Sequence, residues 1–211
     1  MNDLLTLSPF ARQIAGCAMK LRRFREDEGY AYISHQPNTP PDRLFPEDLA
    51  VTLAFNSNAG WRAFASLVKH VHEVDLSKLP DKALHESGPE ERERIIELIS
   101  HMTKWPGFAT SLATKVLHKK RPHLIPVLDN RAIFESYLEE RWPDRHTTGE
   151  TVRDPGRVRQ ALDAIVADVN APANAGTWQA LTKVDPRLTR IEVLDMVWWM
   201  HFREVEPVEG P

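Results

Sequence analysis

The sequence predicts a mainly α fold, because apolar residues recur at helical spacing along most of its length. Pro, Gly and Asn separate the periodic stretches, and no convincing run shows the alternation of a half-buried strand. The expected helices lie near 9–27, 46–56, 59–74, 79–86, 88–104, 108–119, 130–141, 155–170, 174–183 and 188–203.

The chain length of 211 residues allows one substantial core or two small lobes that share a cleft. We therefore expect a single helical domain over residues 1–203, built as a helical bundle with a possible two-lobed shape. Residues 204–211 are acidic and contain Pro and Gly, so we expect a disordered tail there.

Local signals mark several of these elements. The stretch 29–45 holds three prolines with Tyr30 and Tyr32, which predicts a long ordered loop rather than a helix. Helix 88–104 begins well, with Pro89 in its first turn and acids beside it, and Trp105-Pro106-Gly107 ends it. The last helix presents an apolar face made of Ile191, Leu194, Val197 and Trp198.

Several function classes are excluded by composition. The apolar stretches are far shorter than the roughly 20 residues of a membrane span. The N-terminus lacks the order of a secretory signal, so we expect a cytoplasmic protein. Cys17 is the single cysteine, which excludes an internal disulfide and a four-cysteine metal or iron–sulfur site. His70 and His72 point to different helix faces and no metal motif occurs, so we expect neither metal nor cofactor.

Residues 105–130, WPGFATSLATKVLHKKRPHLIPVLDN, carry the strongest functional signal. A helix ends, a Pro-Gly hairpin follows, a second helix runs to about Lys119, and an apolar run delivers Asp129. The segment resembles the signature of helix-hairpin-helix DNA glycosylases of the endonuclease III type, in which an aspartate follows the helix that the hairpin opens. Gly107 precedes Asp129 by 22 positions, as in that family.

The resemblance implies a helix-hairpin-helix glycosylase fold, excision of a damaged or modified base from double-stranded DNA, and Asp129 as the catalytic carboxylate. The lysine of strand-cutting members falls on Ser111, which implies a monofunctional enzyme in DNA repair or anti-phage defence. Lys115, one turn further on, is an alternative for that lysine. Ala109 replaces the second hairpin glycine, and the iron–sulfur cysteines of some members are missing.

A hairpin that feeds a helix N-terminus directs unpaired N–H groups at a DNA phosphate. On this logic the predicted DNA contacts are Pro106, Gly107, Phe108, Ala109, Lys115, Lys119, Lys120 and Arg121. An extruded base needs aromatic stacking partners, for which Tyr30 and Tyr32 are the candidates.

Other interpretations remain open. Asp129 also suits an ordinary helix N-cap, which favours a non-catalytic DNA- or protein-binding module, and an unrelated helical enzyme is a third possibility. The basic stretch 115–123 fits a solvated charge cluster as well as a phosphate contact. The chain is also similar to an uncharacterised, mainly actinobacterial family with a K-R-P-x-L-I-P-x-x-D pattern, which assigns no activity.

Overall fold

The computed structural model describes residues 3–8, 10–28, 35, 37–54, 59–141 and 151–205. The fold is mainly α, as predicted. The α-helices are α1 (Cys17–Arg23), α3 (Val51–Ala54), α4 (Trp61–His70), α5 (Pro89–Met102), α6 (Thr110–His118), α7 (Pro155–Asn170), α8 (Ala175–Val184) and α9 (Arg190–Val205). Two helices have π-type hydrogen bonding, η1 (Phe24–Glu28) and η6 (Asn130–Tyr137). Short 3-10 helices are η2 (Pro46–Ala50), η3 (Val71–Glu73), η4 (Leu76–Lys78), η5 (Leu84–Glu86) and η7 (Pro172–Asn174).

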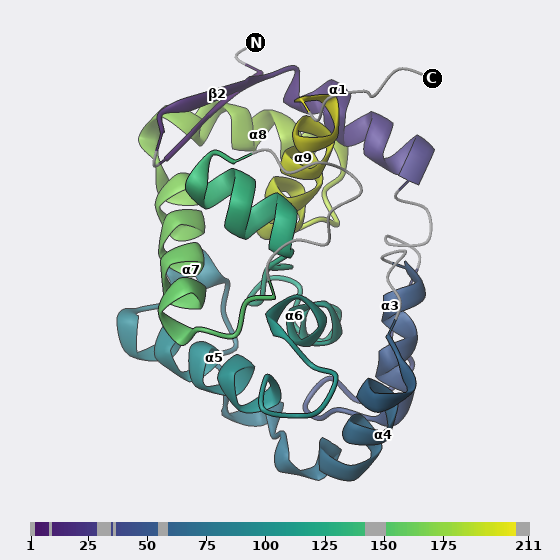
Figure 1. The fold of residues 1–211 in the computed structure, drawn as a ribbon. Helices are drawn as coiled ribbons and strands as arrows, with labels where there is room; N and C mark the ends of the chain where they lie inside the picture. Colours follow the sequence, from purple (N-terminus) through teal and green to yellow (C-terminus); the bar gives the residue numbers. More distant parts are fainter. Residues whose placement is uncertain are drawn as a thin grey trace.

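The helices fall into two groups (Figure 1). Helices α1, α8 and α9 pack together at the end of the molecule that holds both termini, while α4 and α5 lie at the opposite end. Helix α6 runs between the groups, and α7 packs against both α5 and α9. The apolar core is continuous through both groups, so residues near α6 lie at the centre of the molecule.

The first element differs from the predicted helix 9–27. Strands β1 (Leu4–Leu7) and β2 (Arg12–Ala15) form an antiparallel pair, with Leu4 opposite Ala15. The hairpin is held by residues far along the chain: Asn174 bonds both the N–H and the C=O of Thr6 at 2.8 Å. These distant side chains complete the backbone hydrogen bonding of β1, which local sequence cannot reveal.

Most other elements begin where the sequence indicates. Pro89 opens α5, and the Glu91 carboxylate accepts a hydrogen bond of 2.8 Å from the Gly88 N–H. Helix α7 has the predicted bounds and starts with Asp154, which accepts from the Gly156 N–H at 2.9 Å. Helix α9 continues to Val205, two residues into the expected tail, and residues 206–211 lie outside the described residues.

No helix among the described residues is long and apolar enough to span a bilayer.

Candidate functional site

Asp129 is positioned at the head of η6, where it acts as the N-cap. Its Oδ1 accepts hydrogen bonds from the N–H groups of Arg131 (3.0 Å) and Ala132 (3.1 Å). The preceding residue is fixed as well, because the Leu128 N–H donates to Thr114 Oγ1 of α6 at 3.0 Å. The side chain keeps 27% of its surface exposed, so this carboxylate is rigidly held without being sealed in the core.

Two charged side chains from other elements face Asp129. Lys115 of α6 places its Nζ 3.6 Å from Asp129 Oδ2. Asp195 of α9 interacts electrostatically with Asp129 and Lys115, and also with Glu192 and Lys119. The site therefore joins α6, the start of η6 and α9. Lys115 and Asp195 are 80 residues apart in the sequence.

Asp195 holds its proton more tightly than an ordinary aspartate. Burial, with the negative charge of Asp129 next in size, raises the pKa of Asp195 to about 7. Lys115 and Lys119 act in the opposite direction without cancelling the shift. Near pH 7 Asp195 therefore keeps its proton in about half of the molecules.

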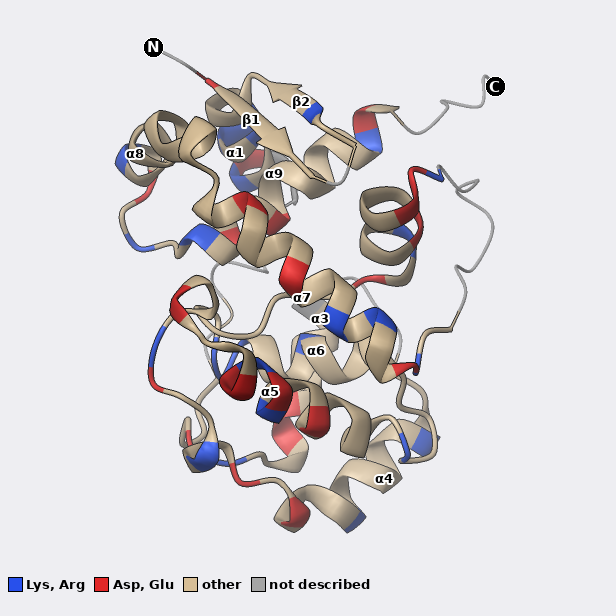
Figure 2. Ribbon diagram, turned by 90° about the vertical axis from the view of Figure 1, so that its left-hand side faces the viewer, with Lys and Arg blue, Asp and Glu red and all other residues tan. Residues whose placement is uncertain are grey.

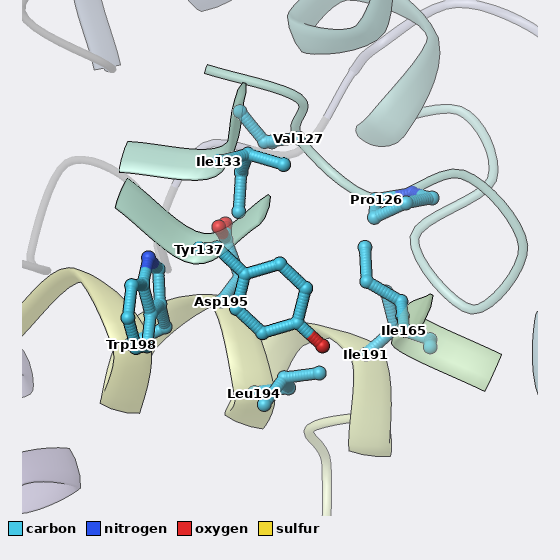
Figure 3. Close-up of a pocket in the computed structure, with 9 residues that line it drawn as sticks. All are labelled: Pro126, Val127, Ile133, Tyr137, Ile165, Ile191, Leu194, Asp195 and Trp198. Carbon is cyan, nitrogen blue, oxygen red and sulfur yellow. The ribbon is translucent and has the colours of Figure 1, made fainter. Parts of the chain in front are cut away.

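A small cavity of about 10 Å³ borders Asp195. Figure 3 shows Asp195 there among apolar side chains, with Leu194 and Trp198 on the same helix. The polar groups of two lining residues are bonded to other parts of the protein. Trp198 Nε1 donates to the Ala132 carbonyl (2.6 Å), and the Tyr137 hydroxyl donates to Asp168. This volume accommodates about one water molecule, so any larger ligand must approach Asp129 from its exposed side.

The predicted hairpin forms, and part of it is at the surface. Gly107 adopts the left-handed conformation (φ +84°), as expected of a turn glycine, and Pro106 and Gly107 are exposed. Phe108 is buried against Trp105, so its side chain is not available to a ligand. The first N–H of α6, that of Thr110, donates to the Val152 carbonyl at 3.1 Å, and Ala109 is half-buried. The helix start is therefore less open to a phosphate than the sequence predicts.

The basic segment after the hairpin faces inward, which corrects both sequence interpretations of it. Lys120 is buried and lies 2.9 Å from Asp48 Oδ2, with further hydrogen bonds to Thr39 and the Pro40 carbonyl. Lys119 is buried too, and its pKa is lowered by burial against the opposing effect of Glu192 and Asp195.

Arg121 is half-buried and donates to the Leu76 carbonyl at 3.4 Å. Lys119, Lys120 and Arg121 thus interact with groups inside the protein. Lys119 and Lys120 are buried, so the prediction that they contact DNA is wrong.

The remaining predicted residues divide into two kinds. Ser111 is half-buried on α6, one turn before Lys115, and its role stays a prediction. Tyr30 and Tyr32 lie outside the described residues. His118 of α6 is fully buried, with Nδ1 2.7 Å from the Ile125 carbonyl. Burial lowers the pKa of His118 to about 3, so it is a neutral core residue.

Sequence reasoning missed Asp195, although a signal for it exists. Ile191, Leu194 and Trp198 are spaced i, i+3 and i+7 on the apolar face of α9, and Asp195 occupies the i+4 position of that same face. An acid in an apolar stripe is costly unless something compensates it. No group of three or more potential ligands in the described segments is arranged to hold a metal ion.

Comparison with known protein families gives a match over most of the chain. Residues 22–202 match the family described as a family of unknown function, DUF6308. The chain belongs to the DUF6308 family. Neither a curated protein nor a solved structure matches it.

The DUF6308 match covers all the elements that build the site. It includes α6, η6 and α9 as far as Phe202, and therefore Lys115, Asp129 and Asp195, whereas β1 and β2 precede it. The charged cluster thus lies within the DUF6308 match, and the β1–β2 hairpin lies outside it.

Proposed function

We propose that this DUF6308 protein is a monofunctional DNA glycosylase that removes a damaged or modified base, in repair or in anti-phage defence. The observation that carries the proposal is the pairing of Asp129 with Asp195 beside Lys115. A carboxylate beside a second carboxyl group that is still partly protonated near neutral pH is suited to breaking a glycosidic bond. The hairpin–helix segment that precedes Asp129 adds the resemblance to helix-hairpin-helix glycosylases.

The chemistry gives each carboxyl group a different role. The Asp129 carboxylate stabilises the positive charge that develops on the sugar and takes a proton from the attacking water, whose oxygen joins the sugar carbon. Asp195, still partly protonated near pH 7, supplies a proton to the departing base through one water molecule, because its cavity of about 10 Å³ admits nothing larger. Transfer of the proton from Asp129 to Asp195 then restores the site, so the net reaction is hydrolysis.

Lys115 decides whether the strand is also cut. In the proposed enzyme Lys115 balances the charge of Asp129. Ser111, which stands where strand-cutting helix-hairpin-helix glycosylases have a lysine, cannot form a Schiff base. Borohydride should therefore trap no covalent complex between protein and DNA. A trapped complex that disappears in Lys115→Ala would instead assign Lys115 as a nucleophile and make the enzyme bifunctional.

The decisive experiment treats duplexes carrying damaged or hypermodified bases with the protein and then with alkali. Strand breaks that depend on alkali would reveal abasic sites. Asp129→Asn should abolish these breaks while it leaves DNA binding intact, because asparagine still caps a helix. Asp154→Asn is the matched control, since Asp154 caps α7 in the same way and lies outside the charged cluster.

Asp195→Asn provides an independent test of the acid–base assignment. It removes the proton donor without changing the size of the side chain, so excision should fall strongly. In the wild-type protein, excision should decline as the pH rises through about 7, where Asp195 loses its proton. DNA binding without abasic sites on any of these substrates would favour the non-catalytic binding module.

A further inference from the structure

The outward face of α4 is apolar and exposed. Trp61 exposes 76% of its surface, Phe64 39% and Val68 49%, and the spacing i, i+3, i+7 places all three on one side of the helix. The rings of Trp61 and Phe64 contact each other, with centroids 5.5 Å apart. The described residues include seven exposed large apolar side chains. Four of them, these three and Leu53, lie within positions 53–68.

This face is also positively charged. The sequence contains no Asp or Glu from 49 to 72 or from 98 to 128, although the protein as a whole carries a net charge of −3. Arg62, Lys69 and Lys104 are exposed within these two stretches. Figure 2 shows α4 in tan and blue without red, whereas α5 carries many acids. Cations and exposed aromatic rings therefore occur together here, without acids on the helix to offset them.

The Pro106-Gly107 hairpin packs against the inner side of α4. Gly107 packs directly on the backbone of α4, because a Cβ at Gly107 would stand 2.6 Å from the Ala63 nitrogen. The Ser66 hydroxyl donates to the Pro106 carbonyl at 2.7 Å. Ala63 and Ser66 are buried on the side of α4 that is turned away from Trp61, Phe64 and Val68. The hairpin therefore holds the helix in place while those three side chains face outward.

We infer that the exposed face of α4 binds DNA: Trp61 stacks on an unpaired base while Arg62 and Lys69 contact phosphates. Every base offers a flat face to an aromatic ring, and the phosphates match the positive charge. A second copy of this chain would bring the same cations face to face, which disfavours self-association. The inference rests on the proposed function and deepens it by naming the surface that holds the strand, but it concerns binding alone.

The test measures binding of the full chain to fluorescein-labelled 20-nucleotide DNA, single-stranded and duplex, by fluorescence anisotropy at low salt. Trp61→Ala should weaken binding of the single strand about tenfold, and Trp61→Phe much less, since phenylalanine keeps a stacking face. The double variant Arg62→Glu and Lys69→Glu should weaken binding of both probes and flatten its dependence on salt. Lys183→Glu, which reverses one exposed charge on α8, and Met19→Ala, an exposed residue of α1, should bind as wild type.

The possible outcomes are distinct. Wild-type affinity in the Trp61 and Arg62/Lys69 variants, or no DNA binding by the wild-type protein, would overturn the inference. Loss of self-association in Trp61→Ala would assign the face to a second copy, and preferential binding to anionic phospholipid vesicles would assign it to a membrane surface. Asp129→Asn should bind DNA normally. Excision can therefore fail while this surface stands, and the surface variants can bind normally while excision at Asp129 stands.

Discussion

Lys120 and Asp48 form an ion pair in the interior, with Nζ 2.9 Å from Oδ2 and side-chain exposures of 1% and 3%. The pair joins the end of α6 to η2, and the Lys120 ammonium also bonds Thr39 and the Pro40 carbonyl. The lysine of the K-R-P element is therefore structural, because it anchors residues 39–48 to the central helix.

Removing one partner of that pair should be costly, because the other charge would remain buried. We expect Lys120→Ala to lower the free energy of unfolding by about 3–5 kcal/mol. Denaturant unfolding would measure the loss. Replacing both partners, as in Lys120→Met with Asp48→Leu, should cost less than Lys120→Ala alone; equal or larger destabilisation would contradict the pairing.

Gly107→Ala should destabilise the protein for two reasons. The left-handed φ of +84° disfavours any Cβ, and the added carbon would stand 2.6 Å from the Ala63 nitrogen. The combined loss should be at least about 1–3 kcal/mol, with a lower melting temperature. Gly176→Ala is the control, because a Cβ there meets nothing within 4 Å and alanine favours a helix.

The capping role of Asp129 can be separated from its proposed chemistry. Asp129→Ala removes the acceptor for the Arg131 and Ala132 amides and should cost about 1 kcal/mol, whereas Asp129→Asn should cost much less. Thermal melts of both variants beside the excision assay would test this. If Asp129→Asn unfolds the protein as readily as Asp129→Ala, its loss of excision would say nothing about catalysis.

Asp195 should make stability depend on pH. The unfolded chain ionises Asp195 near its ordinary pKa of 3.8, while the folded protein keeps the proton until about pH 7. Its contribution to stability is therefore complete below about pH 4, falls as the pH rises from there to 7, and stays low above 7. Each pH unit between the two pKa values is worth about 1.4 kcal/mol, so the fall is on the order of a few kcal/mol.

Asp195→Asn should remove this fall and stabilise the protein at pH 8. Unfolding measured from pH 4 to 8 in both proteins checks the expectation, and replacement of the exposed Asp163 of α7 by Asn is the control. Identical pH profiles for wild type and Asp195→Asn would contradict the raised pKa. A residue that weakens the fold at neutral pH while its replacement strengthens it is typical of a functional site.

Elements with local signals could be predicted, and those held by distant contacts could not. The bounds of α7 match the prediction because Asp154 and Pro155 specify the start within two residues. The expected helix over 79–86 is reduced to η5, since the Leu84 N–H donates to the His123 carbonyl at 2.9 Å instead of to its own turn. Local propensity loses to a tertiary hydrogen bond there.

The candidate site shows the same division. The sequence places Asp129 after a helix and before another, and the structure confirms that geometry as an N-cap. The sequence cannot show that Lys120 turns toward Asp48 while Lys115 turns toward Asp129. The two lysines are five positions apart and differ only in what the rest of the chain brings near them. Asp195 depends on the packing of α9 against η6 in the same way.

The attachment of β1 to the far end of the chain also constrains how the protein is made. Ser8 donates to Asp168, Thr6 bonds Asn174, and the Thr177 hydroxyl donates to the Leu4 carbonyl at 2.6 Å. On the ribosome, strands emerging early must wait for more than 150 further residues before their partners exist. During synthesis β1 therefore lacks these hydrogen-bond partners until residues 168–177 have been made.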